Sequence, residues 1–96
     1  MHQSGSGVKQ DYHAAKEWFE RAAAQGEVGA QMQLAELYLY GHGVEQDNIR
    51  AHMWFSIAAN HGMKFAEKNR DSLARRMRAS EIDKSNELVQ AWKSGT

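Results

Sequence analysis

The fold is decided by a stretch that occurs twice in the chain, as GSGVKQD at residues 5–11 and as GHGVEQD at residues 41–47. Continued in the same register, residues 5–31 and 41–67 align without a gap and share 12 identities. The identities include a Trp-Phe pair in each copy, followed by a pair of alanines and then a glycine. The two copies are offset by 36 residues. Repetition at a period of this length is typical of solenoid arrays, in which each repeat packs mainly against its neighbours.

Each copy is predicted to form a pair of helices. Asp11 and Asp47 stand in the N-cap position, directly before a helical spacing of small and aromatic residues. That spacing puts one face of the first helix in the core, including both Trp-Phe pairs, Trp18-Phe19 and Trp54-Phe55. Gly26 and Gly62 follow the last turn, as left-handed C-cap residues do, and a second helix is expected over residues 28–40.

These motifs resemble the Sel1-like repeat, a relative of the tetratricopeptide repeat. The first copy reads A-x-x-W-F-x-x-A-A-x-x-G and then A-x-x-x-L-A-x-x-Y-x-x-G-x-G-V, from Ala15 to Val44. Ala35 stands where the family commonly has glycine, which keeps that position small. The second copy carries the pattern from Ala51 to Ala66 and then degenerates. The resemblance covers nearly the whole chain and is specific for the fold, but its motif residues are structural and imply no chemistry.

The predicted fold is all-α: an α-solenoid of two helix-pair repeats plus a C-terminal capping helix. This divides the chain into an N-terminal tail and repeat loop at 1–11, two repeats at 12–78, and the capping helix at 79–96. Ser80, with Asp83 three residues on, is a weak capping-box signature for that last helix. Its apolar positions are expected to cover the second repeat: Ile82, Leu88, Val89 and Trp92.

The N-terminal end of the array has no cap of its own. Val28, Met32 and Leu39 are expected to leave apolar surface there, so we predict self-association of the chain as a homodimer through this end. Two interpretations of the whole chain stay open, a minimal complete protein or the C-terminal portion of a longer array. The start at Met1 favours the first interpretation.

Composition excludes several classes of protein. Twelve Lys and Arg balance twelve Asp and Glu, so no overall field attracts nucleic acid or an anionic membrane. The absence of cysteine excludes a disulfide framework and thiolate metal sites. No apolar run approaches the length of a membrane span, and the first residues lack the apolar core of a signal peptide. A cytoplasmic location is therefore expected, or a periplasmic one if the chain belongs to a longer precursor.

Few residues suggest chemistry. The five histidines form no HExxH motif or dense cluster, so they are interpreted as solvated surface residues, and neither a metal nor another cofactor is expected. The GxG loops lack the lysine of a phosphate cradle and are interpreted as turns. A basic helix predicted at 64–78 has Arg75, Arg76 and Arg78 in its last turn, where they complement the helix dipole rather than bind nucleic acid. No nucleophile motif is present, so no enzyme is predicted.

The resemblance to tetratricopeptide arrays implies that the first helix of each repeat lines a concave face where partners bind. On a helical wheel, the positions opposite the buried face are polar in the first repeat and partly apolar in the second. We expect the C-terminal helix to fold onto the apolar patch and to leave a polar groove accessible. The candidate partner-binding residues are His13, Glu17, Glu20, His52, Met53 and Ser56.

The predicted function is a non-catalytic protein–protein interaction module or adaptor that binds a peptide or protein on its concave helical face. The alternative is a small stoichiometric inhibitor or immunity-type protein that blocks an enzyme or effector. A regulatory subunit of a hydrolase is a less favoured third interpretation. The identity of the partner does not follow from the residues.

Overall fold

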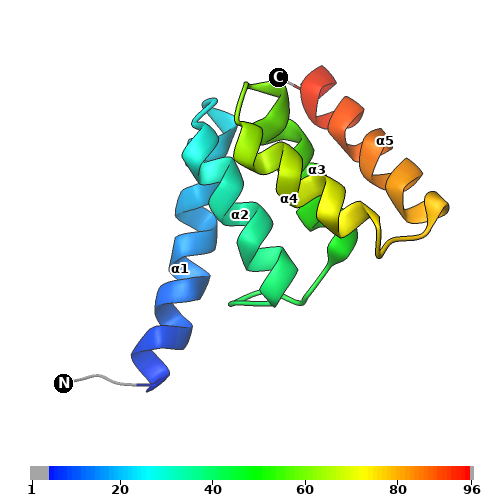
Figure 1. Cartoon of the computed structure of the whole chain (residues 1–96). Helices are drawn as coiled ribbons and strands as arrows, with labels where there is room; N and C mark the ends of the chain where they lie inside the picture. Colours follow the sequence, from blue (N-terminus) through cyan, green and yellow to red (C-terminus); the bar gives the residue numbers. More distant parts are fainter. Residues whose placement is uncertain (1–4, 96) are drawn as a thin grey trace.

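The computed structural model describes the backbone of residues 5–95 and the side chains of residues 14–93. Within this part of the chain there is no strand, and the helices are α1 (Gly5–Ala24), α2 (Val28–Tyr40), α3 (Asn48–Asn60), α4 (Lys64–Ala74) and α5 (Ala79–Gly95). Figure 1 shows that successive helices run in opposite directions, and that loops join the end of each helix to the start of the next. The predicted all-α solenoid of helix pairs is confirmed.

Helix α3 is the centre of the molecule. It packs against α2, α4 and α5, whereas α1 packs mainly against α2. Nine consecutive residues of α3, from Ala51 to Ala59, are buried. A helix contacted on three sides must be apolar or small nearly all round, which explains why residues 51–59 show no single hydrophobic stripe. Small residues let the helices approach closely: Ala51, Ala58 and Ala66 are fully buried at this centre.

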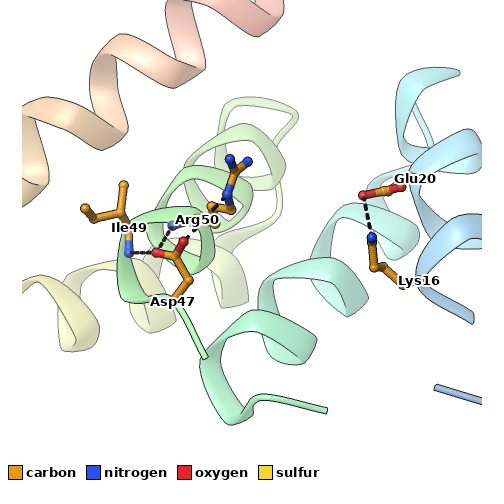
Figure 2. A network of polar contacts seen from close by, with 5 residues as sticks. All are labelled: Lys16, Glu20, Asp47, Ile49 and Arg50. Atoms are coloured by element: carbon orange, nitrogen blue, oxygen red, sulfur yellow. Dashed lines mark hydrogen bonds and ion pairs between the residues drawn. The ribbon is translucent and has the colours of Figure 1, made fainter. Parts of the chain in front are cut away.

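In its second copy, the repeated heptapeptide forms the turn between α2 and α3. Gly41 ends α2 in the left-handed conformation with φ 73°, and its N–H donates to the Leu37 carbonyl at 2.8 Å. A Cβ at Gly41 would also meet the Gln46 side chain at 3.3 Å. Asp47 then caps α3, because its carboxylate accepts from the N–H groups of Ile49 and Arg50 at 3.0 and 3.1 Å (Figure 2). The N-cap predicted at Asp47 is confirmed.

The first copy of the heptapeptide does not form this turn. The described backbone is helical from Gly5, so α1 runs through Asp11, where the sequence predicts the end of a loop at 1–11 and an N-cap. In the second copy, the Leu37 and Tyr38 carbonyls of the preceding helix hold the loop by hydrogen bonds. In the first copy, the hydrogen bonds within α1 satisfy this part of the backbone instead.

The two Trp-Phe pairs differ in burial. Trp54 and Phe55 are buried at 7% and 1% exposure, and the Trp54 ring packs edge-on against Trp92 of α5 with centroids 5.8 Å apart. Trp18 is 65% exposed, and Phe19 is only partly buried against the core. The prediction that Trp18 is a core residue is therefore wrong. Trp54 is covered by α5, but none of the described helices covers Trp18 in the same way.

The ends of α4 and α5 also differ from the prediction. Helix α4 stops at Ala74, so Arg75, Arg76 and Arg78 lie beyond it as exposed residues instead of in its last turn. Helix α5 begins at Ala79, and Glu81 caps it by accepting from the Arg78 N–H at 2.8 Å. Glu81 thus supplies the carboxylate that accepts from the N-cap residue, Arg78. The sequence had instead suggested a capping box formed by Ser80 and Asp83.

The apolar surface expected at the N-terminal end is smaller than predicted. Val28 and Leu39 are partly buried against the core, but Met32 is 7% exposed and belongs to the core itself. Met32 is covered because α1 and α3 flank α2 on both sides. Among the described residues, the large hydrophobic side chains that are exposed are Trp18 of α1, Tyr40 at the end of α2 and Phe65 of α4.

Candidate partner-binding site

The predicted partner-binding residues fall in two separate places. Glu17 and Glu20 are exposed on α1, and Glu20 forms a weak i, i+4 ion pair with Lys16 at 4.0 Å (Figure 2). The side chain of His13 lies outside the described residues. Trp18 is exposed as well, but at about 100° per residue its ring lies about 100° around α1 from Glu17 and about 160° from Glu20.

His52, Met53 and Ser56 are buried, at 4%, 5% and 7% exposure. The prediction that His52 and Ser56 belong to an accessible groove with the α1 carboxylates is wrong, and so is the interpretation of His52 as a solvated histidine. For His52 the cause is α5, which packs on α3 as expected from its apolar stripe and places Ser85 against the imidazole. Val89 of α5 is buried in this contact.

A polar pocket of about 530 Å³ lies where α3, α4 and α5 meet. Helix α3 contributes a stripe of polar residues at i, i+4 and i+8, which are His52, Ser56 and Asn60. The opposite walls carry charged and amide groups from α4 and α5, together with the apolar side chains of Ile82 and Val89. These polar groups are Arg70 and Asp71 on α4, and Asn86, Gln90 and Lys93 on α5. A pocket of this volume is in the range that holds a small ligand or one side chain.

One residue that lines the pocket, His52, makes a buried hydrogen bond. His52 Nδ1 lies 2.7 Å from the hydroxyl oxygen of Ser85, which is itself fully buried on α5. Burial lowers the pKa of His52 below 6.5, the Arg70 charge lowers it further, and the Asp71 carboxylate offsets part of this effect. His52 is therefore uncharged at neutral pH, and its bond to Ser85 links α3 to α5.

Ser56 has no such partner. Its hydroxyl oxygen is buried and makes no hydrogen bond, although a serine inside a helix commonly bonds the carbonyl one turn earlier. It lies one turn after His52, on the same side of α3, and lines the pocket. A buried unsatisfied polar group is uncommon in folded proteins and calls for a structural reason.

The sequence identifies His52 and Ser56 as candidate binding residues, but it does not predict that they line a pocket between three helices. The signal available was the polar stripe on α3, because His52, Ser56 and Asn60 recur at helical spacing in an otherwise apolar helix. Arg70 and Gln90 carry no such signal, since exposed polar residues on outer helices are ordinary. Their convergence on His52 depends on how α4 and α5 pack around α3.

The described residues contain no group of three or more His, Asp or Glu side chains that could hold a metal ion. None of the described helices combines the length and the apolarity that a membrane span requires.

Comparisons with known proteins agree with this architecture. The sequence model of the Sel1 repeat matches residues 1–27 and 28–63, and the second segment contains α2 and α3 together. No curated protein matches the chain at a significant level. The chain is similar to the crystal structure of a protective antigen from uropathogenic Escherichia coli strains, which displays an SLR fold. The TM-score is 0.81 and the sequence identity 35%, over 84% of this chain and 18% of that one. This chain thus spans under a fifth of that protein's length. The matched segments cover about two thirds of the residues, and the chain belongs to the Sel1 repeat family.

Proposed function

We propose that the chain is a non-catalytic module that binds a protein or peptide partner, with its contact surface on the outer face of α1. Sel1 repeats form helical scaffolds that mediate protein–protein interactions, which supports the general role. The position of the surface on this chain comes from the residues of α1 rather than from the family.

The single observation that carries the proposal is the exposure of Trp18. The ring is 65% exposed, whereas Trp54 at the equivalent position of the second repeat is 7% exposed and contacts α5. Tryptophan is enriched among the residues that contribute most to protein–protein binding, and such anchors are commonly ringed by polar groups. Glu17 precedes Trp18, and Glu20 lies one turn after Glu17. The proposed contact surface is therefore the broad exposed arc of α1 that runs from Glu20 through Glu17 to Trp18, and we call it the α1 surface.

The test uses a partner captured from native lysate and then purified. Trp18→Ser should weaken its affinity at least tenfold, since an anchoring aromatic ring is removed. The double variant Glu17→Lys and Glu20→Lys should reduce the association rate, because charge at a rim acts mostly on encounter. Both variants should keep the melting temperature of the wild type, because the substituted side chains are exposed.

The matched control is Glu45→Lys with Glu87→Lys, which makes the same charge change at two exposed positions away from α1. Its affinity for the partner should equal that of the wild type. If the α1 variants bind the partner as tightly as this control does, the contact surface is elsewhere and the proposed site is refuted.

A further inference from the structure

The outer side of α4 is exposed and positively charged. Helix α4 packs on α3, and its buried residues are small or apolar. Five exposed residues fall within an arc of about 100° outside that buried side. They are Phe65, Lys68, Ser72, Arg75 and Arg76, and we call them the α4 surface. From Phe65 to Arg75 this surface is about 15 Å long, at about 1.5 Å per residue.

The positive charge of the α4 surface is not neutralised within the described part of the chain. Its lysine and its two arginines form no ion pair with a described residue. Of the two acids of α4, Asp71 is paired with Arg70 at 3.1 Å, and neither it nor Glu67 lies within the arc. Residues 64–78 hold six Lys and Arg against two Asp and Glu, so this segment has a net charge of +4 in a chain whose net charge is zero.

The two arginines are held on a hydrogen-bonded turn. Arg75 keeps helical backbone angles, φ −63° and ψ −22°, and its N–H donates to the Asp71 carbonyl at 3.3 Å. The Arg76 N–H donates to the Leu73 carbonyl at 2.9 Å. Met77 follows and is buried in the core, which anchors the turn. An ordered backbone therefore presents both guanidinium groups, and this reduces the entropy that is lost when they bind.

An aromatic ring lies at the other end of the α4 surface. Phe65 is 62% exposed in the first turn of α4. Exposed aromatic rings are enriched where proteins contact one another, and guanidinium groups bind carboxylates through paired N–H donors. The α4 surface therefore fits a segment that presents carboxylates together with an apolar side chain.

Single-stranded nucleic acid fits this surface less well. Its binding sites combine a basic groove with several rings on which successive bases stack. The α4 surface has one ring on the outer side of a helix, and the chain has no net positive charge. These features favour a protein segment over nucleic acid.

We propose that the α4 surface binds an acidic segment of the protein partner. Lys68, Arg75 and Arg76 contact its carboxylates, and Phe65 contacts an apolar side chain between them. About five residues of an extended chain span the surface, at about 3.3 Å each. This inference rests on the proposed function, because it assigns the acidic segment to the partner that contacts the α1 surface.

Three labelled probes test which chemistry the full chain recognises. They are acetyl-Glu-Glu-Leu-Glu-Glu-Leu-Glu-Glu-amide, the same peptide with glutamine in place of every glutamate, and a decamer of deoxythymidine. Fluorescence anisotropy measures their binding at about 50 mM and about 200 mM salt. We expect the acidic peptide to bind at least tenfold more tightly than the glutamine peptide and more tightly than the decamer. Its affinity should fall as the salt concentration rises, because exposed charges are screened.

Paired charge variants locate the contact. Lys68→Gln with Arg75→Gln should reduce the affinity for the acidic peptide at least tenfold, since two of the three cations are lost. The matched control is Arg50→Gln with Lys84→Gln, which removes one arginine and one lysine at exposed positions of α3 and α5. This control should bind the acidic peptide as the wild type does.

A second pair of variants tests the aromatic contact. Phe65→Ser should weaken binding of the acidic peptide severalfold, because its leucines lose the ring that they contact. Tyr40→Ser is the control, since it removes a similarly exposed ring at the end of α2. All of these variants should keep the melting temperature of the wild type, because the substituted side chains are exposed.

Three results would overturn the inference. Equal affinity for the acidic and glutamine peptides means that carboxylates are not recognised. A decamer that binds as tightly as the acidic peptide, or more tightly, means that the surface takes any polyanion or prefers nucleic acid. Unchanged affinity of the Lys68 and Arg75 double variant means that the acidic peptide binds elsewhere.

This inference and the proposed function fail separately. If one of these three results appears while the captured partner still depends on the α1 surface, the inference fails and the proposed function stands. If the acidic peptide binds through the α4 surface but no partner depends on the α1 surface, the α4 surface stands and the proposed α1 surface fails.

Discussion

Trp18 and Trp54 occupy equivalent positions of two aligned repeats, yet one ring is exposed and the other is buried. The difference comes from the neighbours of each helix and not from the residues of the repeat. Trp54 is covered because α5 brings Trp92 against it, and no described helix does the same for Trp18. At the scale of the residue, an identical motif therefore has two different energetic roles.

The two tryptophans form a matched pair for a stability experiment. Trp54→Ala should lower the free energy of unfolding by about 3–5 kcal/mol, the usual range when a buried aromatic residue is emptied. Trp18→Ala should lower it by less than about 1 kcal/mol, since most of that ring already contacts water. Urea unfolding at low micromolar protein concentration measures both. Equal losses in the two variants would show that Trp18 is covered in solution.

His52 predicts a pH dependence of stability. Its pKa in the folded chain is lowered below 6.5 by burial and by Arg70, so the unfolded chain binds the proton more readily. Stability should therefore be full above pH 6.5 and should fall as pH drops from 6.5 toward the lowered folded value. Urea midpoints at about pH 7.5 and about pH 5.5 test this direction. His52→Gln removes the titrating group, and a variant that keeps the full wild-type pH response would assign that response to another residue.

At the scale of the element, α5 covers one side of α3. Its Trp92 packs against Trp54 of α3, its Ser85 lies within hydrogen-bond distance of His52, and its Val89 is buried. A terminal helix of a solenoid must present one apolar face to its neighbour and a polar face to solvent. Helix α5 does so, because residues on either side of Val89 along the chain, such as Glu87 and Gln90, are exposed.

Removal of α5 should therefore expose the apolar side of α3. A chain that ends at Arg78 should bind a hydrophobic dye and aggregate, because α3 would present contiguous apolar surface to water. Val89→Asp in the full chain should act in the same direction, since it buries an unpaired charge. Glu87→Ala is the control at an exposed position of the same helix. Dye fluorescence and size-exclusion chromatography give the readout, and an unchanged monomeric truncated chain would contradict the capping role.

At the scale of the whole molecule, the two ends of the stack are unequal. One end is closed by α5, and the other presents α1 with Trp18 exposed and Phe19, Val28 and Leu39 only partly buried. Additional burial at the α1 end would contribute about 25 cal/mol for each Å² of apolar surface removed from water.

In the absence of the partner, we expect the chain to self-associate through this end by a two-fold contact in which the same patch meets itself, so that a second copy and the partner compete for Trp18. Sedimentation over a concentration series should show a dimer that forms with rising protein concentration. Trp18→Lys should shift this equilibrium to monomer without lowering monomer stability, because the ring is exposed. Met32 is unsuitable for this purpose, since it lies in the core and its replacement by lysine would destabilise the fold directly. A strict monomer at high micromolar concentration would refute the expectation.

The sequence by itself determined the class of fold, the positions of α2 and α3, and the turns between the helices. Gly41 and Gly62 adopt positive φ, and Asp47 caps α3, because these features depend on local backbone geometry that a short motif encodes. The spacing of small and apolar residues similarly identified α5 as a helix that packs on α3. Local chemistry and periodicity are readable without the rest of the molecule.

Only the tertiary structure decided which faces remain exposed and which residues meet. Trp18 is exposed, Met32 is buried, and His52 and Ser56 line a pocket instead of an open groove. Each of these outcomes depends on the helices that pack on a given face, and a repeated motif is identical whether or not a neighbour covers it. The pocket unites Ser56 of α3, Arg70 of α4 and Gln90 of α5. Burial and convergence are properties of the packed array, because they arise from contacts between segments that no single helix specifies.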